Sequence, residues 1–232
     1  MARDVKAHRG LTTEHVVDAA LRAADEGGIE AISLRRLAAA LGVTPMAIYR
    51  HVQNKAHLLD LMAERLLGQV DLAPAETATW QERLRRLLAS FQASVAAHPA
   101  GALLLSRPFV SPASVRLSET LLATLHSAGF DAGQSARLLQ VITGMLLGPA
   151  INRATWAAAS RDLPPHGEPQ QASMEGLSAG EFPYLARAAD QFMDWSAGAD
   201  ANRLTIELLV GGLETLAAEP SRGGVPRIVS RE

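Results

Sequence analysis

The sequence contains no cysteine among its 232 residues. This absence excludes disulfide bonds, thiolate metal sites and a cysteine nucleophile, and it suits a cytoplasmic protein. No apolar run approaches the roughly 18 residues that a membrane span requires, so we expect no membrane partner. Residues 1–10 are polar and lack the apolar centre of a signal peptide, and we expect them to form a disordered basic arm.

Motifs of the common enzyme classes are missing as well. The sequence has no Gly-x-Ser-x-Gly, no His-Glu-x-x-His and no Gly-x-x-x-x-Gly-Lys. Its histidines and acidic residues show no metal-ligand spacing. We therefore expect no enzymatic activity, no metal and no cofactor.

Charge is distributed unevenly along the chain. Residues 1–55 hold eight Lys and Arg against six Asp and Glu, whereas the remainder carries a net charge of −4. A basic first segment on an acidic chain is typical of a protein whose first part meets a polyanion. A skew of this size also arises by chance, so it carries weight only beside a motif.

Helical periodicity dominates the sequence, and no sustained apolar alternation indicates a strand. We therefore predict an all-α fold. Caps and breakers place a fourth helix between Asn54 and Pro74, and His98 is expected to cap the end of a helix rather than to contact a ligand. The region 160–180, rich in Pro, Gly, Ser and Gln, is expected to be a flexible loop. The other predicted helices are 13–27, 33–41, 45–51, 80–97, 101–106, 112–129, 134–159, 182–195 and 202–218.

The segment ALGVT, residues 40–44, joins two short helices in a helix-turn-helix pattern. Gly42 suits the turn, Thr44 can cap the second helix and Pro45 suits its first position. In this motif the second helix enters the DNA major groove by its N-terminal end. Leu37 and Ile48 are expected to fill the angle between the helices.

Polar side chains follow the turn closely. Tyr49, Arg50, His51 and Lys55 lie within seven residues of one another. Without the motif, a solvated helix face would be the better interpretation. Next to a helix-turn-helix, their donor groups point to DNA phosphates, because phenol, guanidinium, imidazole and ammonium groups all donate to phosphate oxygens.

The stretch ISLRRLAAALGVTPMAIYRHVQNKAHLLDLMAERLL, residues 32–67, resembles the DNA-binding domain of the TetR family of bacterial transcription repressors. The likeness covers about residues 11–68, and the pattern Tyr-x-His-Val-x-Asn-Lys-x-x-Leu-Leu resembles the Tet repressor branch. Further on, SRP at 106–108, AGF at 128–130 and LLVGGLETL near the end fit the helical regulatory domain of that branch.

The resemblance implies a division of the chain and a set of DNA contacts. It implies a helix-turn-helix DNA-binding domain over 11–70, an effector-binding and dimerisation domain over 71–220, and a flexible tail over 221–232. Base contacts fall on Arg35, Pro45, Met46 and Ala47, and phosphate contacts on Ser33, Thr44, Tyr49, Arg50, His51 and Lys55. A homodimer, built through residues 134–159 and 202–218, would bind a palindromic operator in double-stranded DNA.

The resemblance also bears on the small-molecule effector. The magnesium-binding histidine of the Tet repressor falls at Leu103, its drug-binding glutamine at Leu121 and an acidic position at Asn152. Leucine cannot ligate magnesium, so we predict no tetracycline–magnesium binding. The expected pocket is apolar with a few polar groups; its candidate lining residues are Phe91, Leu103, Phe109, Leu121, Leu125, His126, Gln140, Met145, Asn152 and Trp156.

Plainer interpretations compete with these roles. Phe91, Met145 and Trp156 are better explained by core packing, and His126 by the C-terminal helix dipole. The sequence as a whole predicts a ligand-responsive transcriptional regulator, a repressor released from its operator by an apolar small molecule. The alternative is an all-helical ligand-binding or scaffold protein without sequence-specific DNA binding.

Overall fold

The computed structural model describes residues 10–73, 78–98, 100–159, 180–193 and 198–218, with side chains excepted at 156–159, 189–193 and 198–199. Within these ranges every regular element is a helix, as the sequence predicts. Several predicted features lie outside the described residues: the basic arm, the loop near 160–180, Pro74, the tail at 221–232 and the Trp156 side chain.

The first helices form a compact unit that we call the head. It consists of α1 (Thr13–Gly27), the 3₁₀ turn η1 (Ile29–Ala31), α2 (Leu34–Ala40), α3 (Pro45–Tyr49) and α4 (Lys55–Leu67). Thr12 and Asn54 cap α1 and α4, accepting the amides of His15 and His57.

Two local expectations for the head were wrong. Thr44 stands at the N-cap position of α3, but its side chain makes no capping hydrogen bond, and the same is true of Ser33 at the N-cap of α2. Helix α4 ends at Leu67, with Gly68 as its C-cap, well before Pro74.

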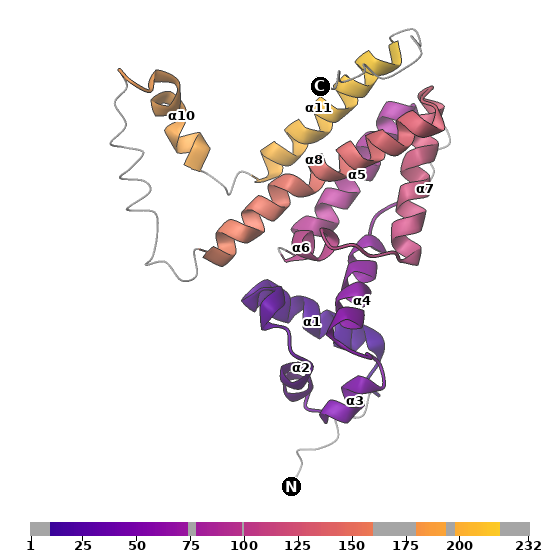
Figure 1. The fold of residues 1–232 in the computed structure, drawn as a ribbon, viewed down its shortest axis with the longest axis vertical. Helices are drawn as coiled ribbons and strands as arrows, with labels where there is room; N and C mark the ends of the chain where they lie inside the picture. Colours follow the sequence, from indigo (N-terminus) through magenta and orange to yellow (C-terminus); the bar gives the residue numbers. More distant parts are fainter. Residues whose placement is uncertain (1–9, 74–77, 99, 160–179, 194–197, 219–232) are drawn as a thin grey trace, which may run out of the picture.

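The later helices form a larger unit that we call the body. It consists of α5 (Trp80–Ala96), α6 (Gly101–Leu105), α7 (Pro112–Ser127), α8 (Ala132–Ala159) and α11 (Gly198–Ala218). Helix α10 (Pro183–Met193) stands apart from these helices in Figure 1. Figure 1 shows α8 and α11 running together at the end of the molecule opposite to α2 and α3. The surface that would meet DNA is therefore far from the paired long helices.

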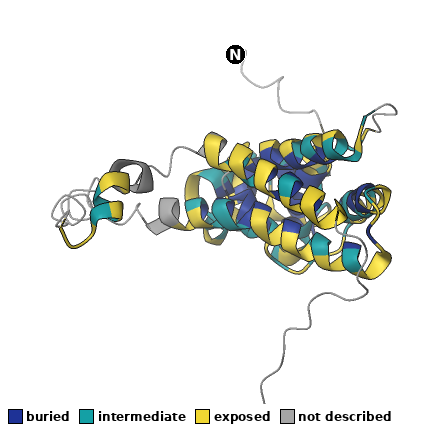
Figure 2. Cartoon of the chain, turned by 90° about the horizontal axis from the view of Figure 1, so that it is seen from above, coloured by how far each residue is buried: buried dark blue, intermediate teal, exposed yellow. Residues whose placement is uncertain are grey.

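Two apolar clusters stabilise the two units, and α4 contributes to both. Leu58, Met62 and Leu66 belong to the cluster of the head, whereas Leu67 belongs to that of the body. Figure 2 shows the buried residues on the inward faces of the body helices. Because the consecutive residues Leu66 and Leu67 are packed in different cores, any movement of α4 would change the packing of both units.

One face of α8 and α11 is left uncovered in the single chain. It exposes the large apolar side chains Val141, Met145, Leu204, Leu208 and Leu216. A Cβ atom built on Gly144, Gly148, Gly211 or Gly212 would meet no neighbouring atom within 4 Å. Large apolar patches of this kind mark interaction surfaces, and the face coincides with the helices for which the sequence predicts dimerisation.

Candidate nucleic-acid interface and effector cavity

The helix-turn-helix is built as its sequence pattern requires. Gly42 adopts a φ of +67°, a region that costs glycine little, and the amide of Val43 then donates to the carbonyl of Ala38 over 2.9 Å. Leu37 and Ile48 are buried between the two helices, so the prediction that they fill the angle is confirmed. The buried Ile48 anchors α3 and directs its other faces outward.

Helix α3 presents exposed side chains at both of its ends. Met46 and Tyr49 are 69% and 50% exposed, although both are large and apolar. Thr44 and Pro45 are exposed and Ala47 is half-buried, while Arg35 lies exposed on α2. Exposed apolar side chains at the N-terminal end of a groove-reading helix are placed to contact thymine methyl groups.

Four of the predicted DNA contacts meet in one place. Ser33, Arg35, Tyr49 and Lys55 line a shallow depression between α2, α3 and the start of α4. Leu34, Gln53 and Asn54 complete the lining, and none of the three was among the predicted DNA contacts. The N-cap at Asn54 could have indicated this part of the lining from the sequence, because the first backbone amides of a helix attract a phosphate.

The remaining phosphate candidates are positioned differently. Nδ1 of His51 lies 3.3 Å from the hydroxyl of Thr13, so only its other ring nitrogen is placed to reach DNA. Arg50 is exposed at the C-cap of α3, outside the depression. Lys55 lies 3.8 Å from Glu30, whose side chain is 99% exposed. A surface pair of this kind is weak, so a phosphate can displace Glu30 at little cost.

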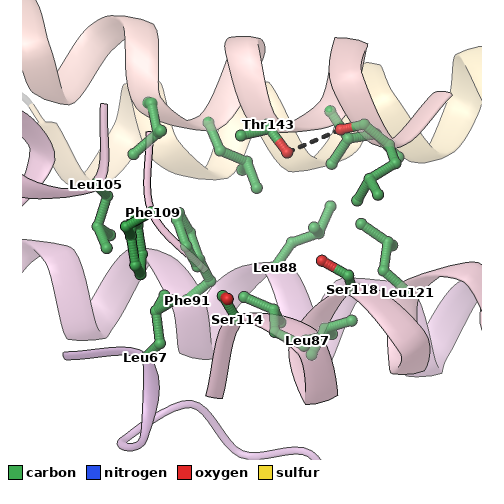
Figure 3. Close-up of a pocket in the computed structure, with 15 residues that line it drawn as sticks. Leu67, Leu87, Leu88, Phe91, Leu105, Phe109, Ser114, Ser118, Leu121 and Thr143 are labelled. Atoms are coloured by element: carbon green, nitrogen blue, oxygen red, sulfur yellow. Dashed lines mark hydrogen bonds between the residues drawn. The ribbon is translucent and has the colours of Figure 1, made fainter. Parts of the chain in front are cut away.

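The body contains a partly open apolar cavity of about 150 Å³. Figure 3 shows Leu67 at one end of the cavity and Leu121 at the other. Helices α5, α7 and α8 supply most of the wall. The complete lining is Leu67, Leu87, Leu88, Phe91, Leu105, Phe109, Ser114, Leu117, Ser118, Leu121, Leu139, Ile142, Thr143, Leu146 and Leu147.

Three of the predicted pocket residues, Phe91, Phe109 and Leu121, line this cavity. The structure places six others outside the lining. Leu125 is buried in the core and Leu103 is half-buried, whereas the remaining four are exposed: His126, Gln140, Met145 and Asn152.

Helical phase explains why the residues predicted on α8 do not line this cavity. Leu139, Ile142, Thr143 and Leu146 follow the spacing of one helix face, and that face of α8 borders the cavity. Residues 140, 145 and 152 lie on other faces of the same helix. The hydroxyls of Ser114, Ser118 and Thr143 also line the cavity and were not predicted; the spacing along α8 points to Thr143 alone, because both serines lie on α7.

The described residues contain no group of three or more Cys, His, Asp or Glu side chains arranged to hold a metal ion. Within the same part of the chain, no helix is both long and apolar enough to cross a membrane.

Polar contacts join the head to the body beside the cavity. Arg107 reaches Asp60 of α4 over 3.5 Å, and its neighbours Leu105 and Phe109 both line the cavity. Glu64 of α4 accepts the amide of Ala113 over 2.8 Å and lies 3.7 Å from Arg116. These contacts connect the segments beside the cavity wall to α4.

Comparison with known proteins agrees with this geometry. Residues 16–62 match the family described as bacterial regulatory proteins, tetR family, and residues 73–217 match the tetracyclin repressor-like C-terminal domain.

Curated relatives match along most of the chain. Tetracycline repressor protein class D from Escherichia coli is 30% identical over 206 residues, covering 88% of this chain and 89% of the relative. An HTH-type transcriptional regulator from Saccharopolyspora erythraea is 28% identical over 213 residues, covering 89% and 86% of the two chains.

Among solved structures, ActR from Streptomyces coelicolor in complex with actinorhodin superposes with a TM-score of 0.69 at 25% identity. The match covers 90% of this chain and 99% of that one.

Proposed function

The chain belongs to the TetR family of bacterial regulatory proteins, and from that membership we propose that it represses transcription from a palindromic operator and is released by a small apolar molecule. Regulators of this family are ligand-responsive, bind operator DNA and act as dimers. They are generally non-enzymatic, and the proposed role requires no catalysis. A repressor of bacterial genes works where the chromosome lies, in the cytoplasm.

The single observation that carries the DNA-binding role is the exposed start of α3 beside the depression lined by Ser33, Arg35, Tyr49 and Lys55. We assign base contacts to Arg35, Pro45, Met46 and Ala47. Guanidinium reads guanine through O6 and N7, and the apolar side chains pack against thymine methyls. The phosphate contacts fall to Ser33, Thr44, Tyr49, Arg50, His51 and Lys55, which fix the register without reading sequence.

Pairing through the exposed face of α8 and α11 brings two heads to one side of the dimer. A two-fold axis then demands two inverted half-sites whose spacing matches the separation of the two α3 helices. Effector binding changes that separation through α4, because Asp60 and Glu64 hold it to the wall of the cavity. Only an effector that binds the released form more tightly can drive the change.

The effector differs from a tetracycline–magnesium complex. Leu103 stands where the resemblance places the metal-binding histidine, and a leucine side chain has no atom that ligates magnesium. The cavity that borders α4 is instead apolar along most of its wall.

Selection from random duplex DNA tests the proposal. The full chain should enrich an inverted repeat, and its affinity for that repeat should fall steeply between 50 and 200 mM salt, by about 10³-fold or more if six phosphates are contacted. An all-helical scaffold without sequence-specific DNA binding would enrich no repeat, and that outcome would refute the proposed function.

A further inference from the structure

Given the regulatory role proposed for the cavity, we infer that its effector is a neutral molecule of about one aromatic ring that carries one hydrogen-bonding oxygen toward Ser118. Anions, cations and metal chelates are excluded as effectors by the same wall. The inference follows from three properties of the lining: its charge, its free hydroxyl and its size.

The lining contains no charged side chain. Twelve of its fifteen residues are leucine, isoleucine or phenylalanine, and the other three are serine or threonine. An ion moved from water into a cavity with this lining loses its hydration and gains no partner of opposite charge. The cost of burying an unpaired charge is far larger than the gain from apolar contact. The cavity therefore selects neutral molecules.

Two of the three hydroxyls are already engaged by the backbone. Ser114 donates to the carbonyl of Ser111 over 2.8 Å and accepts the Ser111 amide over 2.9 Å, as part of the cap of α7. Thr143 donates to the carbonyl of Leu139 over 2.8 Å, the bond dashed in Figure 3. Their donor capacity is spent inside their own helices.

Ser118 differs from both. Its hydroxyl makes no hydrogen bond with any residue that the structure describes, and Figure 3 shows it directed toward the space between the drawn side chains. A hydroxyl offers one donor and two acceptor sites, so it pairs with either a hydroxyl or a carbonyl oxygen. Desolvation by an apolar ligand would leave it unpaired, which favours a ligand that carries one oxygen.

The size of the cavity limits the rest of the molecule. An engineered apolar cavity of 150 Å³ lined by Leu, Ile and Phe binds benzene, and the present cavity has about that volume. Phe91 and Phe109 gather near Leu67, toward the end of the cavity that borders α4. An alkylphenol meets these requirements: its ring fits the volume, and its oxygen reaches Ser118.

Isothermal calorimetry on the full chain without DNA tests the inference, with 4-ethylphenol, ethylbenzene and 4-ethylbenzoate as probes. We expect 4-ethylphenol to bind about three- to tenfold more tightly than ethylbenzene, the worth of one neutral hydrogen bond, and the benzoate not to bind. Ser118→Ala should abolish the preference for the phenol. The matched control Thr143→Val, which removes a hydroxyl already bonded to the backbone, should retain it.

Three outcomes would overturn the inference: comparable binding of the benzoate, an unchanged phenol preference in Ser118→Ala, or no binding of any probe. Operator release is measured separately by fluorescence anisotropy of labelled DNA. Binding of 4-ethylphenol without release would support the ligand class and contradict the proposed regulatory role of the cavity.

Discussion

Nδ1 of His98 lies 2.8 Å from Oδ2 of Asp25, and this contact joins the connection between α5 and α6 to helix α1. Oδ1 of the same carboxylate accepts the amide of Ala100 over 3.4 Å. The two side chains are only 22% and 24% exposed, so solvent screens them less than the surface pairs. The expectation that His98 caps a helix was therefore wrong: it binds the head to the body.

Replacing His98 by Ala should lower the free energy of unfolding by about 1 kcal/mol, because the half-buried Asp25 carboxylate loses a hydrogen-bond donor. For a chain of this length the unfolding temperature should fall by about 2–4 °C. Thermal unfolding by circular dichroism measures the change. Glu30→Gln is the control, since it alters an ion pair that is almost fully exposed. Equal falls in unfolding temperature for His98→Ala and Glu30→Gln would show that the His98–Asp25 contact contributes no more stability than an exposed ion pair.

Arg35→Ala should change which sequence is preferred, whereas Lys55→Ala should weaken all sequences alike. The guanidinium is assigned to a base edge, worth about 1–3 kcal/mol of discrimination at one position. The ammonium group is assigned to a phosphate, so its loss should reduce the salt slope by about one. Competition binding with single-base operator variants distinguishes the two. An unchanged base preference in Arg35→Ala would remove that residue from the base-reading set.

Leu208→Glu should convert the dimer to a monomer and weaken operator binding at least tenfold. Leu208 is 59% exposed on the face shared by α8 and α11, and a carboxylate there would be buried unpaired in the pair. Sedimentation velocity reports the mass. Val110→Glu introduces the same charge at an exposed residue between α6 and α7 and should leave the dimer intact. Loss of the dimer in both variants would argue against the assigned face.

Stability should depend on pH through Glu82. The pKa of its carboxyl is lowered because the backbone N–H and the hydroxyl of Thr79 donate to it at the cap of α5. A lowered pKa means that its stabilisation is present above the ordinary value, near pH 4.5, and is lost as the pH falls through the folded value. The difference in unfolding temperature between the wild type and Glu82→Gln should therefore shrink from pH 7 to pH 3.

Glu119→Gln is the matched control for that comparison, because Glu119 is exposed on α7 and lacks a cap partner. Its unfolding temperature gives the baseline for a change from carboxylate to amide outside a cap. If the difference in unfolding temperature between the wild type and Glu82→Gln grew from pH 7 to pH 3, it would contradict a lowered pKa for Glu82.

The head was largely predictable from the sequence because its signals are local. Thr12, Gly42, Pro45 and Asn54 each determine the backbone within a few residues, and the helices begin close to the predicted positions, although α4 ends earlier than predicted. The cluster that we propose to contact DNA could be located without any distant contact, since Ser33 and Lys55 are separated by only one helix-turn-helix.

The cavity was less predictable because its wall depends on the rotation of helices far apart in the sequence. Gln140 and Met145 are near Thr143 in sequence, yet only Thr143 faces the cavity. Likewise, no local signal pairs His98 with Asp25 across 73 residues. Such relationships follow from tertiary packing, which short-range periodicity in the sequence does not predict.

The hydrophobic interior of the head is completed by Ala100 and Leu104, residues that the chain supplies only after α5. A fragment truncated after α4 would lack both side chains, so its apolar cluster would be incomplete and the DNA-binding unit would be less stable on its own. Chimaeras that exchange operator specificity between relatives must therefore transplant the turn at 100–104 together with the first four helices.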